Sequence, residues 1–396
     1  NLLKSEDVIS TLNCLKKLGV KIKISKNSCE IYGNGLNNFK YNKKITLDAG
    51  NSGTLGRLIM GLLVHTKVKI KIKGDKSLSK RDFLRVTKPL KKFGAKFNLK
   101  KNLPVEIVGL KSPRPISYIE NKGSAQCKSA VMLAALKSKG TTMIKAKKSR
   151  DHTELMLKFL KVPISIRKSD DNYDFIKIKG VKKIGPLKYK IPGDISSCAF
   201  FIVLTILSKN SELFLKDINI NPSRIGIIKI LKLMGAKIKL LNIRFYKGEK
   251  IADIFVKSSK NLTAINCPTK YNSNAIDEFL VIFLIAAKSK GVSNFKNLSE
   301  LNQKESPRLK WAGRILNSMG IKNITTNNSI KIYGNPKLIV NKNIIIRNFS
   351  KDHRVFMMSV IAALTFGGKW KIYDLDSINT SFPKFLNILK KLSPKT

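Results

Sequence analysis

Cysteine and histidine are scarce in this sequence, and neither forms a metal-binding pattern. No two of the five cysteines make a CxxC pair, which indicates free thiols in a reducing compartment. The three histidines, His65, His152 and His353, share no ligand spacing. We therefore expect no zinc site and no other bound metal.

Long hydrophobic runs are also absent. The longest apolar stretches, residues 198–207 and 279–287, are too short to cross a bilayer. No apolar signal segment begins the chain, and it opens at Asn1 without a methionine, so we expect that a preceding segment is missing. These features predict a cytoplasmic protein without a membrane span.

Acidic residues are few: 25 Asp and Glu stand against 77 Lys and Arg, for a formal net charge of +52. Clustered lysines would indicate nucleic-acid binding, because they neutralise phosphates. Here they are spread singly through every segment, without interleaved aromatic residues for base stacking. A basic nucleic-acid-binding protein is therefore only an alternative, whereas a positive field that attracts anionic substrates is expected.

The length of 396 residues is too great for one ordinary core, and a hydrophobic content of 43% is typical of a globular protein. Segment 188–193, which includes Pro192 and Gly193, has the composition of a domain boundary. We expect two domains, residues 1–192 and 193–396.

One pattern recurs along the chain: an amphipathic helix, a glycine or its equivalent, and a short β-branched strand. The strands of this pattern end near Ile24, Leu99, Ile166, Leu240 and Thr325. A last helix, 385–392, lies where a sixth copy would begin. The glycines of the pattern are Gly19, Gly94, Gly235 and Gly320. Each stands where a left-handed residue closes a helix without a Cβ clash.

The remaining periodicity predicts the fold class. Lysine alternates with isoleucine or valine in residues 68–72 and 176–179, which predicts half-exposed strands. Longer apolar stretches predict buried helices at 129–136, 199–207, 280–287 and 356–364. We expect an α/β (α+β) protein with mixed sheets around central helices.

Two motifs of the first half combine turn residues with anion-binding groups. GNSGT (50–54) precedes a predicted helix, 55–64, whose free N–H groups would attract an anion, although the same residues are ordinary N-caps. In KSLSKR (76–81), Arg81 follows a turn, and its planar guanidinium suits a carboxylate or phosphate unless it is merely solvated.

Two further segments of the first half place hydroxyl groups at predicted helix starts. GSAQ (123–126) puts Ser124 and Gln126 there, with Cys127 directed to the core. Ser149 occupies a similar position before Glu154. A phosphate site and a capping role both fit these segments.

The second half supplies carboxylates and more arginines. Asp277 and Glu278 precede an apolar helix, where a carboxylate acts as a general base or complements the helix dipole. In KESPR (304–308) one helical turn would bring Lys304 and Arg308 onto one face. KDHR (351–354) ends in Arg354 before another apolar helix. These groups indicate an enzyme for small, multiply anionic substrates.

Taken in order, these motifs resemble the 5-enolpyruvylshikimate-3-phosphate synthase family, the 3-phosphoshikimate 1-carboxyvinyltransferases. The likeness covers essentially the whole chain and includes SRDHTE (149–154), IPGDISS (191–197) and TSFPKF (380–385). It implies the enolpyruvyl transferase fold, an inside-out α/β barrel of two similar domains. Each domain is built of three βαβαββ units with internal helices, and the two close over substrate at a hinge.

The resemblance also implies residue roles. The residues implied to hold shikimate 3-phosphate are Ser124, Ala125, Gln126, Ser149, Asp277 and Lys304. The residues implied to bind phosphoenolpyruvate are Gly53, Arg81, Gln126, Arg308 and Arg354. Asp277, Glu305 and Lys304 are implied to move protons during addition and elimination. The first domain would be the shikimate 3-phosphate side, and the second the phosphoenolpyruvate and acid/base side.

The family likeness further implies a monomer that needs no metal or cofactor and that is a target of glyphosate. The family's Lys-Ser-x-Ser-x-Arg motif would precede Asn1, so an inactive truncated fragment is one alternative. Pro307 and Thr380 also depart from residues frequent in the family. Enolpyruvyl transfer to UDP-N-acetylglucosamine is another alternative, although that enzyme carries a reactive loop cysteine where this chain has Arg81.

Overall fold

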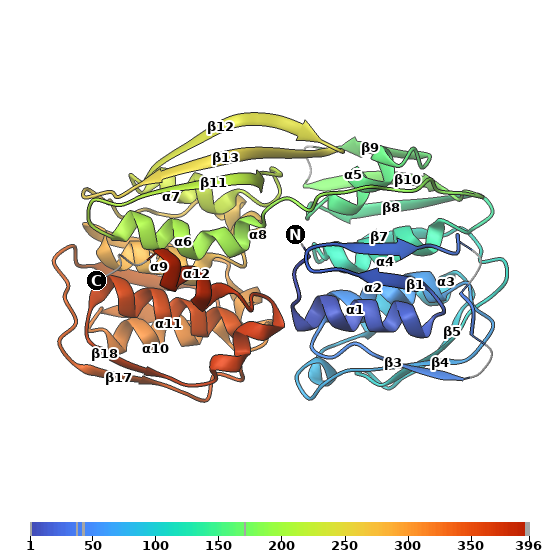
Figure 1. Ribbon diagram of the computed structural model, residues 1–396, viewed down its shortest axis with the longest axis horizontal. Helices are drawn as coiled ribbons and strands as arrows, with labels where there is room; N and C mark the ends of the chain where they lie inside the picture. Colours follow the sequence, from blue (N-terminus) through green and yellow to red (C-terminus); the bar gives the residue numbers. More distant parts are fainter. Residues whose placement is uncertain (1, 37–38, 42–43, 170–171, 393–396) are drawn as a thin grey trace. The chain divides into compact units, whose positions relative to one another are not determined.

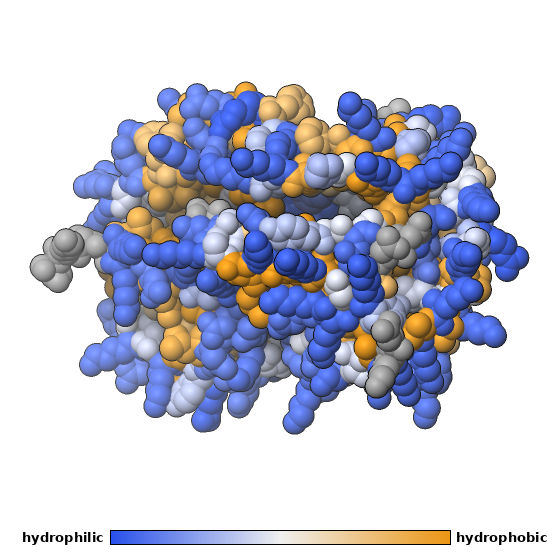
Figure 2. Space-filling view, turned by 45° about the vertical axis from the view of Figure 1, so that its right-hand side comes forward, coloured by the Kyte–Doolittle hydropathy of each residue, from blue (hydrophilic) through white to orange (hydrophobic). Residues whose placement is uncertain are grey.

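The computed structural model describes residues 2–36, 39–41, 44–169 and 172–392. The chain forms two compact units, Asn1–Ile191 and Pro192–Thr396. Among the described residues, none of the helices has the length and apolar character needed to span a membrane. Hydrophilic residues cover most of the face seen in Figure 2, with smaller hydrophobic areas between them.

The first unit contains two complete βαβαββ repeats. The elements of the first repeat are β3 (Ile45–Asp48), α2 (Gly53–Leu63), β4 (Ile70–Lys73), α3 (Leu84–Lys92), β5 (Lys96–Asn98) and β6 (Val105–Val108). Those of the second are β7 (Ser117–Glu120), α4 (Ala125–Ala135), β8 (Thr141–Lys147), α5 (His152–Phe159), β9 (Ile164–Lys168) and β10 (Tyr173–Lys179). The sheets have equivalent strand orders, β3-β4-β6-β5 and β7-β8-β10-β9, with the first pair parallel and the rest antiparallel.

A partial repeat precedes these two. It consists of α1 (Glu6–Lys17) and the antiparallel pair β1 (Lys21–Ile24) and β2 (Cys29–Tyr32). A short 3₁₀ helix, η1 (Leu78–Lys80), lies between β4 and α3. Figure 1 shows α2 and α4 inside this unit, between the sheet of β3 and β4 and the sheet of β8 and β10.

The second unit repeats the same order with shortened first strands. The elements of its first repeat are α6 (Ile195–Leu207), β11 (Glu212–Asn219), α7 (Gly226–Leu233), β12 (Lys237–Tyr246) and β13 (Glu249–Lys257). Those of its second are α9 (Phe279–Lys288), β14 (Gly291–Phe295), α10 (Arg308–Ser318), β15 (Asn323–Thr325) and β16 (Ile330–Gly334). In both, isolated parallel bridges stand in place of the first strand, for example Gly193 with Ile218.

The second unit ends with β17 (Asn343–Ile346), α11 (His353–Phe366), β18 (Lys369–Ile372) and α12 (Phe385–Leu392), with β17 and β18 parallel. Its short helices are η2 (Thr269–Tyr271), α8 (Asn272–Ala275), η3 (Ser299–Gln303) and η4 (Leu375–Thr380).

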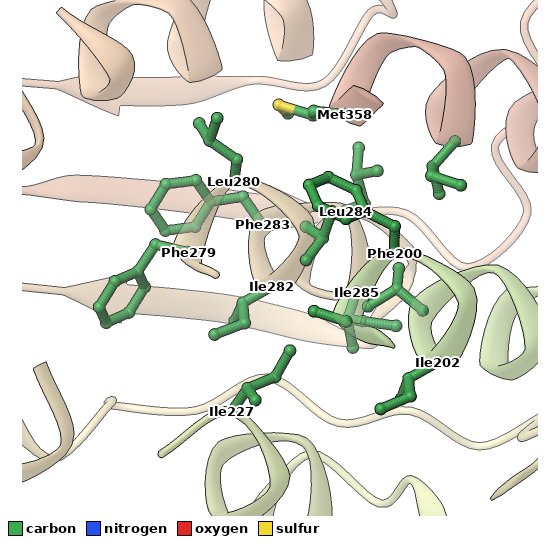
Figure 3. Close-up of a cluster of buried hydrophobic side chains, with 14 of the residues drawn as sticks. Phe200, Ile202, Ile227, Phe279, Leu280, Ile282, Phe283, Leu284, Ile285 and Met358 are labelled. Atoms are coloured by element: carbon green, nitrogen blue, oxygen red, sulfur yellow. The ribbon is translucent and has the colours of Figure 1, made fainter. Parts of the chain in front are cut away.

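Helix α9 forms the centre of the second unit. Every residue from Phe279 to Ala287 is buried, so this helix is apolar on all sides rather than on one stripe. Figure 3 shows its side chains between those of α6 (Phe200, Ile202), α7 (Ile227) and α11 (Met358). Asp277 lies directly before the N-cap of this helix, Glu278.

The repeat pattern predicted from the sequence is confirmed. The four repeat glycines, Gly19, Gly94, Gly235 and Gly320, all have positive φ, and Lys161 takes the same conformation in the copy that lacks glycine. The left-handed conformation is required there because the chain must reverse from helix to strand within one residue. The α/β class with mixed sheets around internal helices is also confirmed.

Some boundaries differ from the predictions. Helix α2 begins at Gly53 rather than residue 55, because Ser52 already caps it by accepting a hydrogen bond from Leu55 N at 3.2 Å. The buried helix predicted at 356–364 lies within α11, where most of these residues are buried and Leu364 is 55% exposed.

Candidate active site

The start of α2 is tied to the turn before Arg81. Asn51 Nδ2 donates to Asp75 Oδ2 at 2.6 Å, and Asp75 Oδ1 accepts from Leu78 N at 2.7 Å. Asp75 N also donates to Gly50 O at 2.9 Å. The GNSGT and KSLSKR motifs therefore form one structure, which brings Arg81 to the N-terminus of α2.

Two guanidinium groups lie against Gly53. A Cβ added at this glycine would stand 2.8 Å from Arg57 Nη1 and 3.1 Å from Arg81 Nη1. Arg57 Nη1 donates to Gly53 O at 3.2 Å and to Gln126 Oε1 at 2.8 Å. Gln126 in turn donates from Nε2 to Thr54 Oγ1 at 2.8 Å. The structure thus brings together three predicted residues, Gly53, Arg81 and Gln126.

Arg57 lies beside these predicted residues, although it was not itself predicted from the sequence. Its guanidinium stacks over the buried ring of Phe83, with Cζ 4.9 Å from the ring centroid. Burial lowers the pKa of Arg57, and the charges of Arg81 and Arg85 lower it further. Its spacing of four residues from Gly53 was the available signal, since residues i and i+4 lie on one helix face.

Ser124 is held in place as the N-cap of α4. Its main-chain N–H donates to Glu120 Oε2 at 2.8 Å, and its Oγ accepts from Cys127 N at 3.3 Å. Ala125 follows as the first helical residue. The capping interpretation of Ser124 is therefore confirmed.

Ser149 is not a cap. Helix α5 begins at His152 with Asp151 as N-cap, so the prediction that Ser149 stands at the helix start is wrong by two residues. The Oγ of Ser149 is buried and has no hydrogen-bond partner among the described residues. Gly123 lies beside this segment, since a Cβ there would be 3.7 Å from Lys148 O. The structure therefore brings Ser149 close to the start of α4.

In the second unit, two basic side chains lie close to the carboxylate of Asp277. Its Oδ1 lies 3.5 Å from Lys304 Nζ and 3.6 Å from Arg308 Nη1. Its main-chain carbonyl accepts from Arg354 Nη1 at 2.7 Å. The predicted residues of IDE, KESPR and KDHR are therefore adjacent in space.

The reason predicted for the proximity of Lys304 and Arg308 is wrong. They do not share a helical turn, because Lys304 has extended backbone after η3 and α10 begins only at Arg308, following Pro307. Lys304 also contacts Glu300 Oε1 at 3.3 Å. Lys304 and Arg308 lie near each other because both approach the carboxylate of Asp277, and not because of helical spacing.

Arg308 is the most constrained arginine of this group. It is 2% exposed, and its Nε donates to Asp352 Oδ2 at 2.8 Å while Nη2 donates to Glu305 Oε2 at 2.5 Å. Burial by itself would lower the pKa of Arg308, but Asp352 and Glu305 outweigh it and raise that pKa. Asp352, which the sequence reasoning did not single out, also caps α11 by accepting from Arg354 N at 3.0 Å.

A hydrogen-bonded network that starts at the buried Glu278 lies next to Asp277. Glu278 is 2% exposed and accepts a hydrogen bond from Ser196 Oγ, which accepts from Arg224 Nη2 at 2.7 Å. Arg224 Nη2 also donates to Asp194 Oδ1 at 2.7 Å. Burial raises the pKa of Glu278, with the positive charge of Arg224 opposing that rise.

The residues of the two units suit different chemistry. The first unit presents guanidinium groups, hydroxyls and a helix N-terminus, which bind anions. The second presents a carboxylate between cations, which can accept a proton and hold an anionic group. Among the described residues, His, Cys, Asp and Glu form no group of three or more arranged for a metal ion.

Comparison with known proteins identifies close relatives. A family model described as EPSP synthase (3-phosphoshikimate 1-carboxyvinyltransferase) matches residues 1–389. The 3-phosphoshikimate 1-carboxyvinyltransferase of Petrotoga mobilis is 38% identical over 99% of this chain and 90% of its own length. That of Ruthia magnifica is 40% identical over 98% of this chain and 88% of its own.

Solved structures agree with these matches. The EPSP synthase of Acinetobacter baumannii superposes with a TM-score of 0.86 and 35% identity, covering 98% of this chain and 88% of that one. The enolpyruvyl transferase NikO of Streptomyces tendae has a TM-score of 0.72 at 13% identity, over 98% of this chain and 87% of its own. The second likeness shows the fold alone.

Proposed function

The chain belongs to the EPSP synthase family, and from this premise we propose which of its residues perform the family's reaction. It transfers the enolpyruvyl group of phosphoenolpyruvate to the 5-hydroxyl of shikimate 3-phosphate and releases phosphate, a step of the shikimate pathway. The family match over residues 1–389 carries this conclusion. Transfer to UDP-N-acetylglucosamine and nucleic-acid binding are not favoured.

The first domain, residues 1–192, supplies the binding groups for shikimate 3-phosphate. Ser124 and Ser149 donate hydroxyl hydrogens to its phosphate, aided by the N–H groups that begin α4 at Ala125. The unpartnered Oγ of Ser149 supports this role, because a buried hydroxyl without a partner is costly until a ligand supplies one. Gln126 lies beside both this segment and the arginines.

Arg81 binds phosphoenolpyruvate, and Gly53 leaves space for it. The guanidinium groups of Arg57 and Arg81 close to Gly53 support this assignment, because two fixed cations favour a ligand with more than one negative charge. Arg57 is added here to the residues that the family likeness implied.

The second domain, residues 193–396, supplies the proton-transfer groups. Asp277 takes the proton of the 5-hydroxyl as that oxygen bonds to C2 of phosphoenolpyruvate, while Lys304 or Glu305 delivers a proton to C3. The resulting tetrahedral intermediate then returns a proton from its new methyl group to Lys304 or Glu305 and expels phosphate, which restores the double bond. The contact between Lys304 Nζ and Asp277 Oδ1 at 3.5 Å supports a shared role in these transfers.

Arg308 and Arg354 stabilise negative charge on phosphoenolpyruvate during both steps. Preorganised cations are effective here because they need no rearrangement when charge develops. Arg308 is preorganised by Asp352 and Glu305, and Arg354 by the carbonyl of Asp277.

We also propose a cytoplasmic monomer that acts without a cofactor. The free state of Cys14, Cys29, Cys127, Cys198 and Cys267 supports a reducing compartment. Sedimentation at assay concentration tests the monomer and should give the mass of one chain. The reaction rate after chelator treatment tests the absence of a metal cofactor and should be unchanged.

The test is the formation of enolpyruvylshikimate 3-phosphate together with stoichiometric phosphate release from shikimate 3-phosphate and phosphoenolpyruvate. A parallel assay replaces the acceptor with UDP-N-acetylglucosamine and is expected to give no product. Absence of product with shikimate 3-phosphate, from protein that remains folded, would overturn the proposed function.

A further inference from the structure

Two segments of the first unit run side by side, and both carry proposed substrate-binding serines. Residues 123–129 include Ser124, and residues 148–154 include Ser149. Besides the approach of Gly123 to Lys148 O, Ser129 Oγ lies 2.7 Å from Thr153 Oγ1. An ion pair completes the connection, with Lys128 Nζ 2.5 Å from Glu154 Oε1.

This ion pair is almost completely removed from water. The side chain of Lys128 is 0% exposed and that of Glu154 is 2% exposed. Beyond their mutual contact, neither Lys128 Nζ nor Glu154 Oε2 has a hydrogen-bond partner among the described residues. Burial raises the pKa of Glu154, and Lys128 opposes that rise.

Stability does not account for such a pair. Taking two charges out of water costs several kcal/mol for each ion, and replacing a buried pair with apolar side chains of similar size is often neutral or stabilising. Two other ion pairs of the first unit avoid this cost, since Lys69 and Glu106 are 46% and 21% exposed and Lys73 and Asp48 are 54% and 48% exposed. The buried pair therefore calls for an explanation other than stability.

The position of the pair supplies one. Lys128 lies in the first turn of α4, where its main-chain N donates to Ser124 O at 3.1 Å. Glu154 lies in the first turn of α5. A short, directional contact between these two turns fixes the separation of the segments that carry Ser124 and Ser149, because each segment leads directly into one of the two helices.

We propose that Lys128 and Glu154 are positioning residues, which hold Ser124 and Ser149 at the separation required to bind one phosphate group between them. This inference deepens the proposed function and rests on it, because it assumes that these serines hold the phosphate of shikimate 3-phosphate. Neither residue touches the substrate. An apolar pair could fill the same volume, but it would let the two segments slide past each other.

The principal test replaces both charges together. Lys128→Met combined with Glu154→Leu keeps the net charge and approximately the volume, so no unpaired ion is left inside the protein. We expect the KM for shikimate 3-phosphate and its dissociation constant by calorimetry to rise at least tenfold, with the KM for phosphoenolpyruvate and kcat within twofold of the original. Lys69→Met with Glu106→Leu makes the same exchange at an exposed pair of the first unit and is the control.

A second variant keeps the inference testable if the double variant does not fold. Glu154→Asp retains both charges but withdraws the carboxylate by one methylene, and we expect a several-fold rise in the KM for shikimate 3-phosphate alone. An unchanged KM in either folded variant overturns the inference, as does an equal loss of affinity for both substrates, which would indicate a purely structural pair. Failure of the unmodified chain to bind shikimate 3-phosphate would instead overturn the proposed function.

Discussion

Arg354 Nη1 donates a 2.7 Å hydrogen bond to the main-chain carbonyl of Asp277, across 77 residues of sequence. The contact joins the first turn of α11 to the residue before the N-cap of α9. It fixes the backbone of Asp277, while Lys304 and Arg308 approach its side chain. A carboxylate held from both sides has little freedom, which suits a group that must meet a substrate hydroxyl in one orientation.

The first prediction concerns proton removal by Asp277. Asp277→Asn retains the size of the side chain but removes its basicity, so kcat for phosphate release should fall by about 10²- to 10⁴-fold. Binding of shikimate 3-phosphate, measured by calorimetry, should change far less. Glu212→Gln, at an exposed ion pair of the same unit, is the control and should retain full activity. A kcat within threefold of the original would exclude Asp277 as the base.

The second prediction concerns the stability contributed by Arg308. Arg308→Met would leave Asp352, which is 0% exposed, without its cationic partner, and unfolding free energy should fall by about 3–5 kcal/mol. Urea denaturation measures this difference. Lys310→Met on the same helix removes an exposed charge and should alter stability by less than about 0.5 kcal/mol. Similar losses in both variants would contradict a special role for the buried arginine.

The third prediction tests the surroundings of Gly53. Glyphosate should compete with phosphoenolpyruvate, and Gly53→Ala should raise the inhibition constant more than the KM for phosphoenolpyruvate. The new Cβ would come closest to the side-chain ends of Arg57 and Arg81 and would displace these without moving any backbone, so the protein should still fold. Gly185→Ala is the control, because no atom lies within 4 Å of a Cβ at that position. An unaltered inhibition constant in Gly53→Ala would place this glycine away from the anion site.

The fourth prediction separates backbone strain from steric clash when a repeat glycine is replaced by alanine. Gly235 and Gly320 have nearly equal φ values of +88° and +87°, but a Cβ at Gly235 would be 2.8 Å from Asn261 O, whereas one at Gly320 meets no atom within 4 Å. Gly320→Ala should therefore lower the unfolding free energy by about 1–2 kcal/mol from backbone strain alone. Gly235→Ala should lower it by distinctly more. Equal losses on thermal and urea unfolding would show that the carbonyl contact is unimportant.

The fifth prediction is a pH dependence caused by His353. Burial lowers the pKa of this side chain to about 4 from 6.5, with Asp352 opposing the shift and Arg354 and Arg308 adding to it. Between these values the unfolded chain binds the extra proton, so protein stability should decrease as the pH falls from about 6.5 toward 4.

His353→Gln should reduce the slope of unfolding free energy against pH between about 6.8 and 5, a range in which ordinary carboxylates change little. His65, whose pKa burial lowers to about 3, contributes a slope of the same sign and remains in this variant. An identical slope in the original protein and in His353→Gln would refute the assignment.

Much of the fold was predictable because its determinants are local. The helix, glycine and strand pattern appears in the order of residues, and the positive φ of Gly19 and Gly94 follows from the need to reverse the chain without a Cβ clash. Burial of α9 follows from an apolar stretch with no polar face. The site motifs were also recognisable, because anion-binding groups occur beside turn residues in each of them.

The sequence by itself thus determined the repeats, the α/β class and the residue types available for catalysis. Only the tertiary structure decided which side chains meet: Arg57 with Gln126, Arg308 with Asp352, and Lys128 with Glu154. The physical reason is that periodicity and backbone preference act over a few residues. An ion pair across a folded core depends instead on how helices far apart in sequence pack. The residues next to a charged side chain in the sequence therefore do not reveal its partner.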